Sequence, residues 1–181
     1  ALTISELVAR LDGGEGIPAR TVAITFDDGY EDNLTVAAPL LGARDLPATV
    51  YLTTGYLPGC PGPATKAGPV PGRMMGWDRL AELESHGIEV GAHSHTHPQL
   101  DVVPKTEATS EIERSKDLLE TGLGHAISSF AYPHGYATRW IRDEVRRCGF
   151  RSACGVRNAF CHLDDDRWML ARLTVMAGTT C

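Results

Sequence analysis

The amino-acid sequence predicts an α/β fold in which a parallel sheet is covered by helices. Short apolar runs rich in β-branched residues alternate along the chain with segments of helical periodicity. Strands of this kind, separated by helices, are typical of parallel sheets that are buried on both faces. Three of the runs are followed directly by residues that can do chemistry. The spacing of the elements suits an open sheet and a barrel equally well.

Each element can be assigned in chain order from its periodicity and turn residues. The best strand candidates are short and apolar and cover residues 21–26, 48–52, 88–92 and 127–132. Helices are expected over residues 31–44 (with a kink at Pro39), 77–86, 104–121 and 139–148. The last three helices are each followed by a residue type that ends helices, namely Gly87, Gly122 and Gly149. Two weaker strand candidates cover residues 151–156 and 173–176.

Composition indicates a single globular domain over residues 1–181. Hydrophobic residues make up 43% and charged residues 22% of the chain, which excludes a disordered tail, a coiled coil or a collagen-like fibre. One segment differs, because nine of the 17 residues at positions 57–73 are Pro or Gly. Neither a helix nor a central strand can run through this segment, so we interpret it as a long surface loop.

Charge and patterning exclude several classes of partner. The net charge is −6, from 17 basic and 23 acidic residues, which argues against nucleic acid because phosphate binding needs a basic surface. No apolar run reaches the roughly 18 residues that a membrane span needs, and the first ten residues lack the pattern of a signal peptide. The five cysteines form no CxxC pair, so we expect free thiols, which favours a reducing compartment.

Two adjacent carboxylates, Asp27 and Asp28, follow the first strand and precede Gly29. In parallel α/β folds the active site lies at the carboxyl ends of the strands. Two close carboxylates repel each other, so one stays protonated unless a cation lies beside them. The alternative is a structural Asp-Gly turn that caps a helix, which is common for this dipeptide.

Three histidines, His93, His95 and His97, lie within five residues just past the third strand. Neutral imidazoles bind borderline metals well, so the cluster favours a metal site. Two of these histidines together with Asp28 would form a site with open positions for water and substrate, which is typical of catalytic metals. Asp27 would then be free to act as base on the metal-bound water, and the pattern predicts metal-assisted hydrolysis.

A third group, residues 130–135 (Phe-Ala-Tyr-Pro-His-Gly), also ends a strand. Its proline and glycine can shape a turn that aims a backbone N–H into a cleft. An ordinary strand-to-helix loop explains this segment equally well.

With these motifs the chain resembles the polysaccharide deacetylases, also called the NodB-homology domain or carbohydrate esterase family 4. Residues 25–29 (TFDDG) match the first motif of the family, His93-Ser94-x-x-His97 matches the second, and residues 130–135 are similar to the third. The resemblance covers roughly residues 20–176. It implies a distorted (β/α) barrel related to the TIM barrel.

The resemblance also implies a set of roles. Asp27 would be the general base, and Asp28, His93 and His97 would bind one divalent metal, usually Zn²⁺ and in some members Co²⁺, Ni²⁺ or Mn²⁺. The backbone N–H of His134 would help to hold the oxyanion. His95 would point outward or lie behind the ligands. The usual reaction removes an N- or O-acetyl group from a sugar, and some members hydrolyse other carbon–nitrogen bonds that are not peptide bonds.

The chain departs from the family pattern in three places. Many members have Arg where this chain has Ala131, and we hypothesise that Arg172 reaches Asp27 instead. The Leu-x-His that supplies the general acid near the C-terminus of many members is absent, so His134, His162 or water would provide the proton. Relatives often have an extra strand and helix before the position of Ala1, which predicts a barrel incomplete at both ends or a compact variant.

Aromatic residues near the motifs are candidates for contacts to a sugar. An aromatic ring can pack against the C–H groups of a sugar, and we expect substrate contacts from Tyr30, Tyr132, Pro133 and Trp168. For Trp77 we expect core packing instead.

The leading hypothesis is a metal-dependent deacetylase that acts on an acetylated carbohydrate. One alternative is a carbohydrate-binding module on the same scaffold without turnover, and another is a family member that hydrolyses a non-sugar amide. An Fe(II) oxygenase would use a similar triad, but its ligand order and all-β scaffold differ from this pattern. A wall polysaccharide as substrate would require export, while the sequence itself is equally compatible with the cytoplasm.

Overall fold

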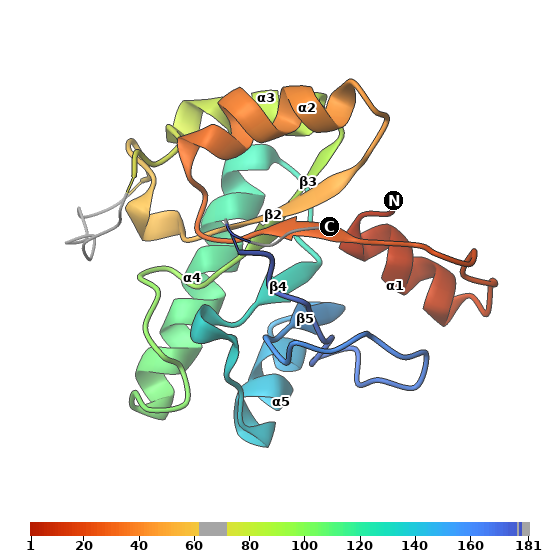
Figure 1. Cartoon of the computed structure of the whole chain (residues 1–181). Helices are drawn as coiled ribbons and strands as arrows, with labels where there is room; N and C mark the ends of the chain where they lie inside the picture. Colours follow the sequence, from red (N-terminus) through yellow and green to blue (C-terminus); the bar gives the residue numbers. More distant parts are fainter. Residues whose placement is uncertain (62–71, 177, 179–181) are drawn as a thin grey trace.

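A computed structural model describes residues 1–61, 72–176 and 178 of the chain, and these residues form a five-stranded sheet (Figure 1). All neighbouring strands are parallel. The strands are β1 (Ile24–Phe26), β2 (Ala48–Leu52), β3 (Ile88–Ala92), β4 (Ser129–Ala131) and β5 (Ser152–Cys154). Their order in the sheet follows the order in the sequence without a reversal. Such a sheet curls into a half-barrel, whereas a doubly wound sheet changes direction at a switch point.

The expected helices are present and cover the outer face of the sheet. They comprise a π-helical turn (Asn33–Ala37) that continues into α2 (Ala38–Gly42), a 3₁₀ turn (Trp77–Arg79) that continues into α3 (Leu80–Ser85), α4 (Lys105–Leu123) and α5 (Arg139–Arg147). Helical residues run without a break from 31 to 42, and Pro39, the expected site of a kink, lies just after the π-helical turn. Proline has no N–H to donate to the preceding turn, and the wider π-helical turn is the distortion of the helix at this point.

Helix α4 continues through Gly122 and ends at Gly124, which has a left-handed φ of 76°. Gly122 therefore does not end the helix as expected. A Cβ at this position would lie 2.7 Å from Cζ2 of Trp77, so the glycine allows the indole ring to pack closely against the helix. The expectation that Trp77 packs in the core is confirmed.

The two faces of the sheet differ because alternate residues point in opposite directions. The outer-facing side chains pack with the helices in the main apolar cluster and include Val50, Leu52, Val90, Phe130 and Ala153. The inner-facing residues between them are small or polar apart from Tyr51, and they include Thr49, Glu89, Gly91, Ser129 and Cys154. The half-barrel thus has an apolar outer face and a partly polar interior.

Helix α1 (Ile4–Asp12) was not expected from the sequence, and it covers this interior (Figure 1). Ile4 and Val8 pack with Tyr51 and other inner-face residues in a second apolar cluster. The start of the helix is fixed by a capping box between Thr3 and Glu6. The Thr-x-x-Glu spacing was therefore a signal for this helix in the sequence.

Glu89 connects α1 to the inner face of the sheet. Its carboxylate accepts hydrogen bonds from the N–H and Oγ of Ser5 at 3.0 and 2.7 Å, from Thr49 Oγ1 at 2.9 Å and from Ser129 Oγ at 2.7 Å. We expect Glu89→Ala to lower the free energy of unfolding by about 2 kcal/mol, because the buried hydroxyls of Thr49 and Ser129 and the half-buried Ser5 lose their acceptor. Urea denaturation measures the change. The exposed Glu107→Ala serves as the control, and equal effects of both variants would contradict this role of Glu89.

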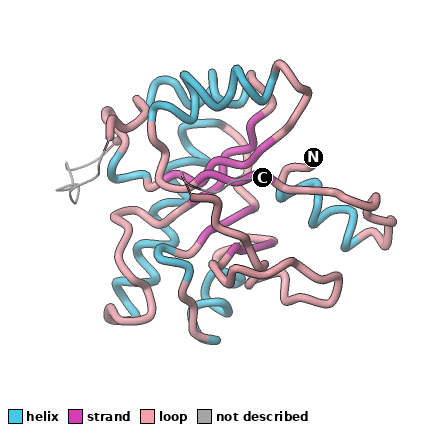
Figure 2. The backbone as a smooth tube through the Cα atoms, viewed as in Figure 1, coloured by secondary structure: helices cyan, strands magenta, loops and turns pink. Residues whose placement is uncertain are grey.

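The weaker strand expected over residues 173–176 is wrong, and the segment is a loop (Figure 2). Just before it, Leu170 forms a single parallel bridge with Cys154. The side chains of Leu173, Val175 and Met176 are 52–80% exposed. An apolar alternating pattern becomes a strand only where a neighbouring strand pairs with it. The other expected strands are confirmed, although β1, β4 and β5 are each three residues long.

Most of the expected Pro/Gly-rich loop (57–73) lies outside the described residues. Among the helices that the structure describes, none is both long and apolar enough to cross a bilayer.

Candidate active site

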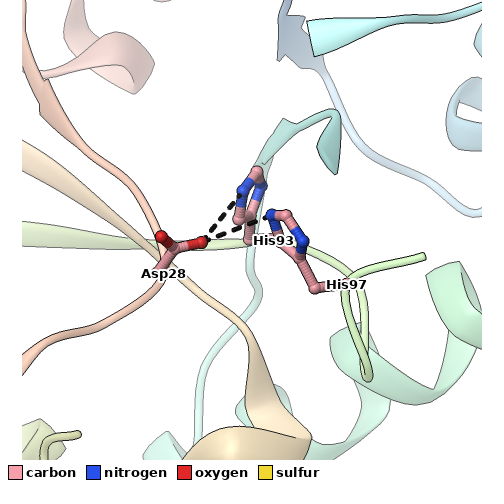
Figure 3. A group of neighbouring side chains, drawn as sticks. All are labelled: Asp28, His93 and His97. Atoms are coloured by element: carbon pink, nitrogen blue, oxygen red, sulfur yellow. Dashed lines mark ion pairs between the residues drawn. The ribbon is translucent and has the colours of Figure 1, made fainter. Parts of the chain in front are cut away.

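Asp28, His93 and His97 meet at the carboxyl ends of the strands (Figure 3). Asp28 follows β1, and the two histidines lie in the loop after β3. One carboxylate oxygen of Asp28 lies 3.6 Å from Nε2 of His93 and 3.4 Å from Nε2 of His97. One potential ligand atom from each residue lies within 4.8 Å of the others. The structure thus brings together the three residues that were expected to bind the metal.

The donor atoms of this triad suit a divalent cation. Nδ1 of His93 lies 2.7 Å from the carbonyl oxygen of Ala131, which can only accept, so Nδ1 carries the proton and Nε2 presents a lone pair. That lone pair faces a carboxylate oxygen of Asp28, and a cation between the two atoms would relieve their repulsion. Burial and the neighbouring His93 lower the pKa of His97 to about 4, so this imidazole is also neutral and able to ligate at neutral pH.

Asp27 lies next to the triad and is paired with Arg172. Nη1 and Nη2 of Arg172 donate to the two carboxylate oxygens at 2.7 and 2.8 Å, which is the bidentate geometry of a strong ion pair. Thr25 Oγ1 and the carbonyl of Gly155 also accept hydrogen bonds from the guanidinium. The contact that we hypothesised for Arg172 is therefore present in the structure.

The charges around Asp27 keep it ionised. Burial by itself raises the pKa of this carboxyl group, but His93 and the Arg172 guanidinium more than offset the effect and hold the pKa below its ordinary value of 3.8. An ionised carboxylate beside a candidate metal site can accept a proton.

The backbone is strained at this site. Among the described residues other than glycine, seven have positive φ, and four of them are Asp28 (73°), Ser94 (62°), His97 (60°) and His134 (61°). Left-handed conformations cost on the order of 1 kcal/mol or more for such residues and cluster at functional sites. The strain supports a functional interpretation of the three strand-end loops.

The family model for polysaccharide deacetylases matches residues 15–153 of the chain. The chain belongs to the polysaccharide deacetylase family. YxkH of Bacillus subtilis (strain 168) is 24% identical over 165 residues, and the match covers 88% of this chain and 53% of YxkH. A 30.6 kDa protein of Geobacillus stearothermophilus is 25% identical over 150 residues, which are 82% of this chain and 49% of that protein. The chain thus spans about half the length of the curated relatives it matches.

Solved structures share the fold. The Streptococcus pyogenes deacetylase PplD, in complex with acetate, has a TM-score of 0.85 and 23% identity over 98% of this chain and 74% of its own. IcaB from Ammonifex degensii has a TM-score of 0.81 and 22% identity over 97% of this chain and 76% of its own. These similarities confirm the predicted distorted barrel of the polysaccharide deacetylase family, incomplete in this chain.

The third deacetylase motif places His134 beside the triad. The residue has a left-handed backbone conformation in a short turn after β4, and its ring centroid lies 4.7 Å from that of His97. His162 lies in an exposed loop, where its backbone N–H donates to the carboxylate of Asp165. Of the two histidines considered as proton donors, the structure thus places His134 against a candidate metal ligand.

Of the two positions expected for His95 in this deacetylase-family chain, outward or behind the ligands, its burial excludes the first. Its side chain is 4% exposed, and Nδ1 lies 2.8 Å from Oγ1 of Thr54. The sequence pattern treats the three clustered histidines alike, and only the tertiary contacts distinguish the buried one.

Two of the expected substrate contacts, Tyr132 and Pro133, have buried side chains in the structure. The ring of Tyr132 is completely buried against Phe130, and its hydroxyl donates to the carbonyl of Trp168. Pro133 is also buried. Residues 130 and 132 have the same strand parity, so both side chains point to the core rather than to the interior of the barrel.

The other two candidates differ in their position. Trp168 lines a cavity of about 230 Å³ with arginines of α5, and its Nε1–H donates to Phe150; none of the triad residues lines that cavity. Tyr30 is half-buried. Burial raises the pKa of its hydroxyl, and the nearby charge of Asp28 raises it further. Tyr30 therefore remains a candidate for substrate contact.

Sequence reasoning missed Tyr56, whose ring centroid lies 6.4 Å from that of His97 and whose hydroxyl donates to the carbonyl of Thr96.

Proposed function

We propose that this chain is a metal-dependent hydrolase that removes an acetyl group from an N- or O-acetylated sugar or polysaccharide. The observation that carries the proposal is the Asp28–His93–His97 triad with an ionised carboxylate, Asp27, beside it. Membership of the polysaccharide deacetylase family supports it. A wall polysaccharide as substrate would place the protein outside the cytoplasm.

The triad would hold one divalent cation, with Zn²⁺ the best match to two imidazoles and a carboxylate. When bound, this ion would polarise the acetyl carbonyl and lower the pKa of a water molecule to about 7. Asp28 contributes negative charge, and the hydrogen bond from His93 to Ala131 fixes the orientation of that ring.

Asp27 would act as the general base. Its carboxylate would accept the proton of the attacking water, and Arg172 would hold it in the orientation that this transfer needs. The N–H of His134 would donate to the developing oxyanion. The imidazole of His134, close to His97, would provide the proton for the leaving amine or alcohol.

Acetate release from N-acetylglucosamine oligomers tests the proposal. We expect turnover by the purified protein, loss of turnover after chelation, and recovery when Zn²⁺ or Co²⁺ is added back. Metal-restored protein that binds the oligomers without releasing acetate would support the carbohydrate-binding alternative. Release from simple amides but not from sugars would support the non-sugar alternative.

Arg172→Ala is expected to lower kcat/KM by about 100-fold, because the base loses its fixed orientation. The acidic limb of the pH profile should also move to higher pH. Arg172 helps to hold the pKa of Asp27 down, so without it the raising effect of burial is less opposed and the base becomes protonated at higher pH. Arg142→Ala, which breaks a different ion pair with Asp166, is the control. Unchanged turnover in Arg172→Ala would contradict the role of this arginine.

A further inference from the structure

The carboxylate of Glu111, in α4, faces the loop that carries both histidine ligands. Only 9% of this residue is exposed. One carboxylate oxygen accepts the backbone N–H groups of His95 and Thr96 at 2.8 and 2.6 Å, and the other accepts the hydroxyl of Thr96 at 2.7 Å. Three donors on one buried carboxylate form a strong, charge-assisted contact.

The loop needs such support because its conformation is strained. Ser94 and His97 both have left-handed φ values, of 62° and 60°. One internal hydrogen bond, from the N–H of His97 to Oγ of Ser94 at 3.0 Å, closes the turn. A turn of this kind opens easily unless its surroundings hold it.

The opposite side of the loop is held by the turn after β2. The N–H of Thr54 donates to the carbonyl of Ser94 at 3.3 Å, and the N–H of Gly55 donates to that of His95 at 2.7 Å. These contacts engage the carbonyl groups of the loop, whereas Glu111 engages N–H groups. Hydrogen bonds thus hold the loop on both sides, to the turn after β2 and to α4, and Glu111 provides the charged contact.

We propose that Glu111 is a positioning residue that holds residues 93–97 in the conformation that binds metal, and that it thereby sets the metal affinity. This inference rests on the proposed metal site. Glu111 accepts hydrogen bonds from His95 and Thr96, which lie between the two ligands, so it acts through the backbone of the loop. Outer-shell contacts that orient metal ligands commonly change metal affinity by about 10–100-fold.

Glu144 provides a matched control. It is also 9% exposed and also accepts from a threonine, Thr109, and it pairs with Arg147. It links α5 to α4 through Thr109 and Arg147, and neither of these partners belongs to the histidine loop. The two variants Glu111→Gln and Glu144→Gln therefore remove one buried negative charge each, from different places.

The experiment measures two quantities for wild type and both variants. Zn²⁺ affinity is determined by competition with a chromophoric chelator, and hydrogen exchange of the amides of residues 95 and 96 is measured by NMR on the metal-free proteins. We expect Glu111→Gln to weaken Zn²⁺ binding by about 10-fold or more and to speed exchange of both amides, because the neutral amide oxygen of Gln is a weaker acceptor for the two backbone N–H groups than a carboxylate oxygen. Glu144→Gln should change neither quantity.

Wild-type affinity and wild-type exchange in folded Glu111→Gln would overturn the inference, as would equal losses in both variants. If the wild type binds no Zn²⁺, the proposed function fails, and the amide exchange alone decides whether Glu111 holds the loop. Should Glu111→Gln not fold, Thr96→Val decides, because it removes only the hydroxyl donor; we expect a smaller loss of affinity in the same direction.

Discussion

Asp27→Asn is expected to lower kcat/KM for acetate release by about 1000-fold while the protein keeps its metal. An asparagine oxygen can still accept from Arg172, but it cannot take a proton from water at neutral pH. Asp27 is not one of the three residues whose ligand atoms converge, so the metal site should persist. Acetate assays and elemental analysis on the same preparation separate chemistry from binding.

The control for this variant is Asp101→Asn, which changes an exposed carboxylate in a loop before α4. It should leave both turnover and metal content unchanged. If Asp27→Asn retained more than about one tenth of the wild-type rate, another group would have to accept the proton. If it lost its metal, Asp27 would belong to the ligand set.

Asp28→Asn is expected to abolish tight metal binding and, with it, turnover. The wild type should contain about one divalent metal per chain, and the variant should fall to background. Asp28 lies within 3.6 Å of both imidazole Nε2 atoms, and it is the residue of the triad that contributes negative charge. A neutral amide oxygen is a weaker ligand for a divalent cation than a carboxylate.

Elemental analysis after gel filtration measures this result without any choice of substrate. His97→Ala should behave in the same way, since it removes a second ligand. An equal metal content in wild type and both variants would mean that the metal binds elsewhere, and the proposed mechanism would fail.

The triad could be predicted from sequence because strand ends converge in a parallel sheet. Asp28 and His93 come from strands that are separated in the sheet by β2, yet both lie at the same edge. The contact of Arg172 was also predictable. Many family members have an arginine at the position of Ala131, and without it the carboxylate of Asp27 requires another cation.

Other features depend on tertiary context that local patterns do not contain. Whether an apolar segment such as residues 173–176 forms a strand depends on a free neighbour in the sheet. The burial of His95 depends on Thr54, 41 positions away in the chain. The burial of Tyr132, by contrast, follows from its position two residues after Phe130, on the same face of the strand. Helix α1 follows from its capping box, so both features could have been predicted from the sequence.

The position of Arg172 also bears on how this family can change. All three candidate ligands and the base lie between residues 27 and 97, but the partner of the base lies 145 positions from Asp27, beyond the stretch of 15–153 that matches the family. The residues proposed to hold the metal and the arginine proposed to orient the base are therefore encoded in separate stretches of the gene. A change confined to the later stretch could therefore remove Arg172 and leave Asp27, the three candidate ligands and the three motifs unaltered.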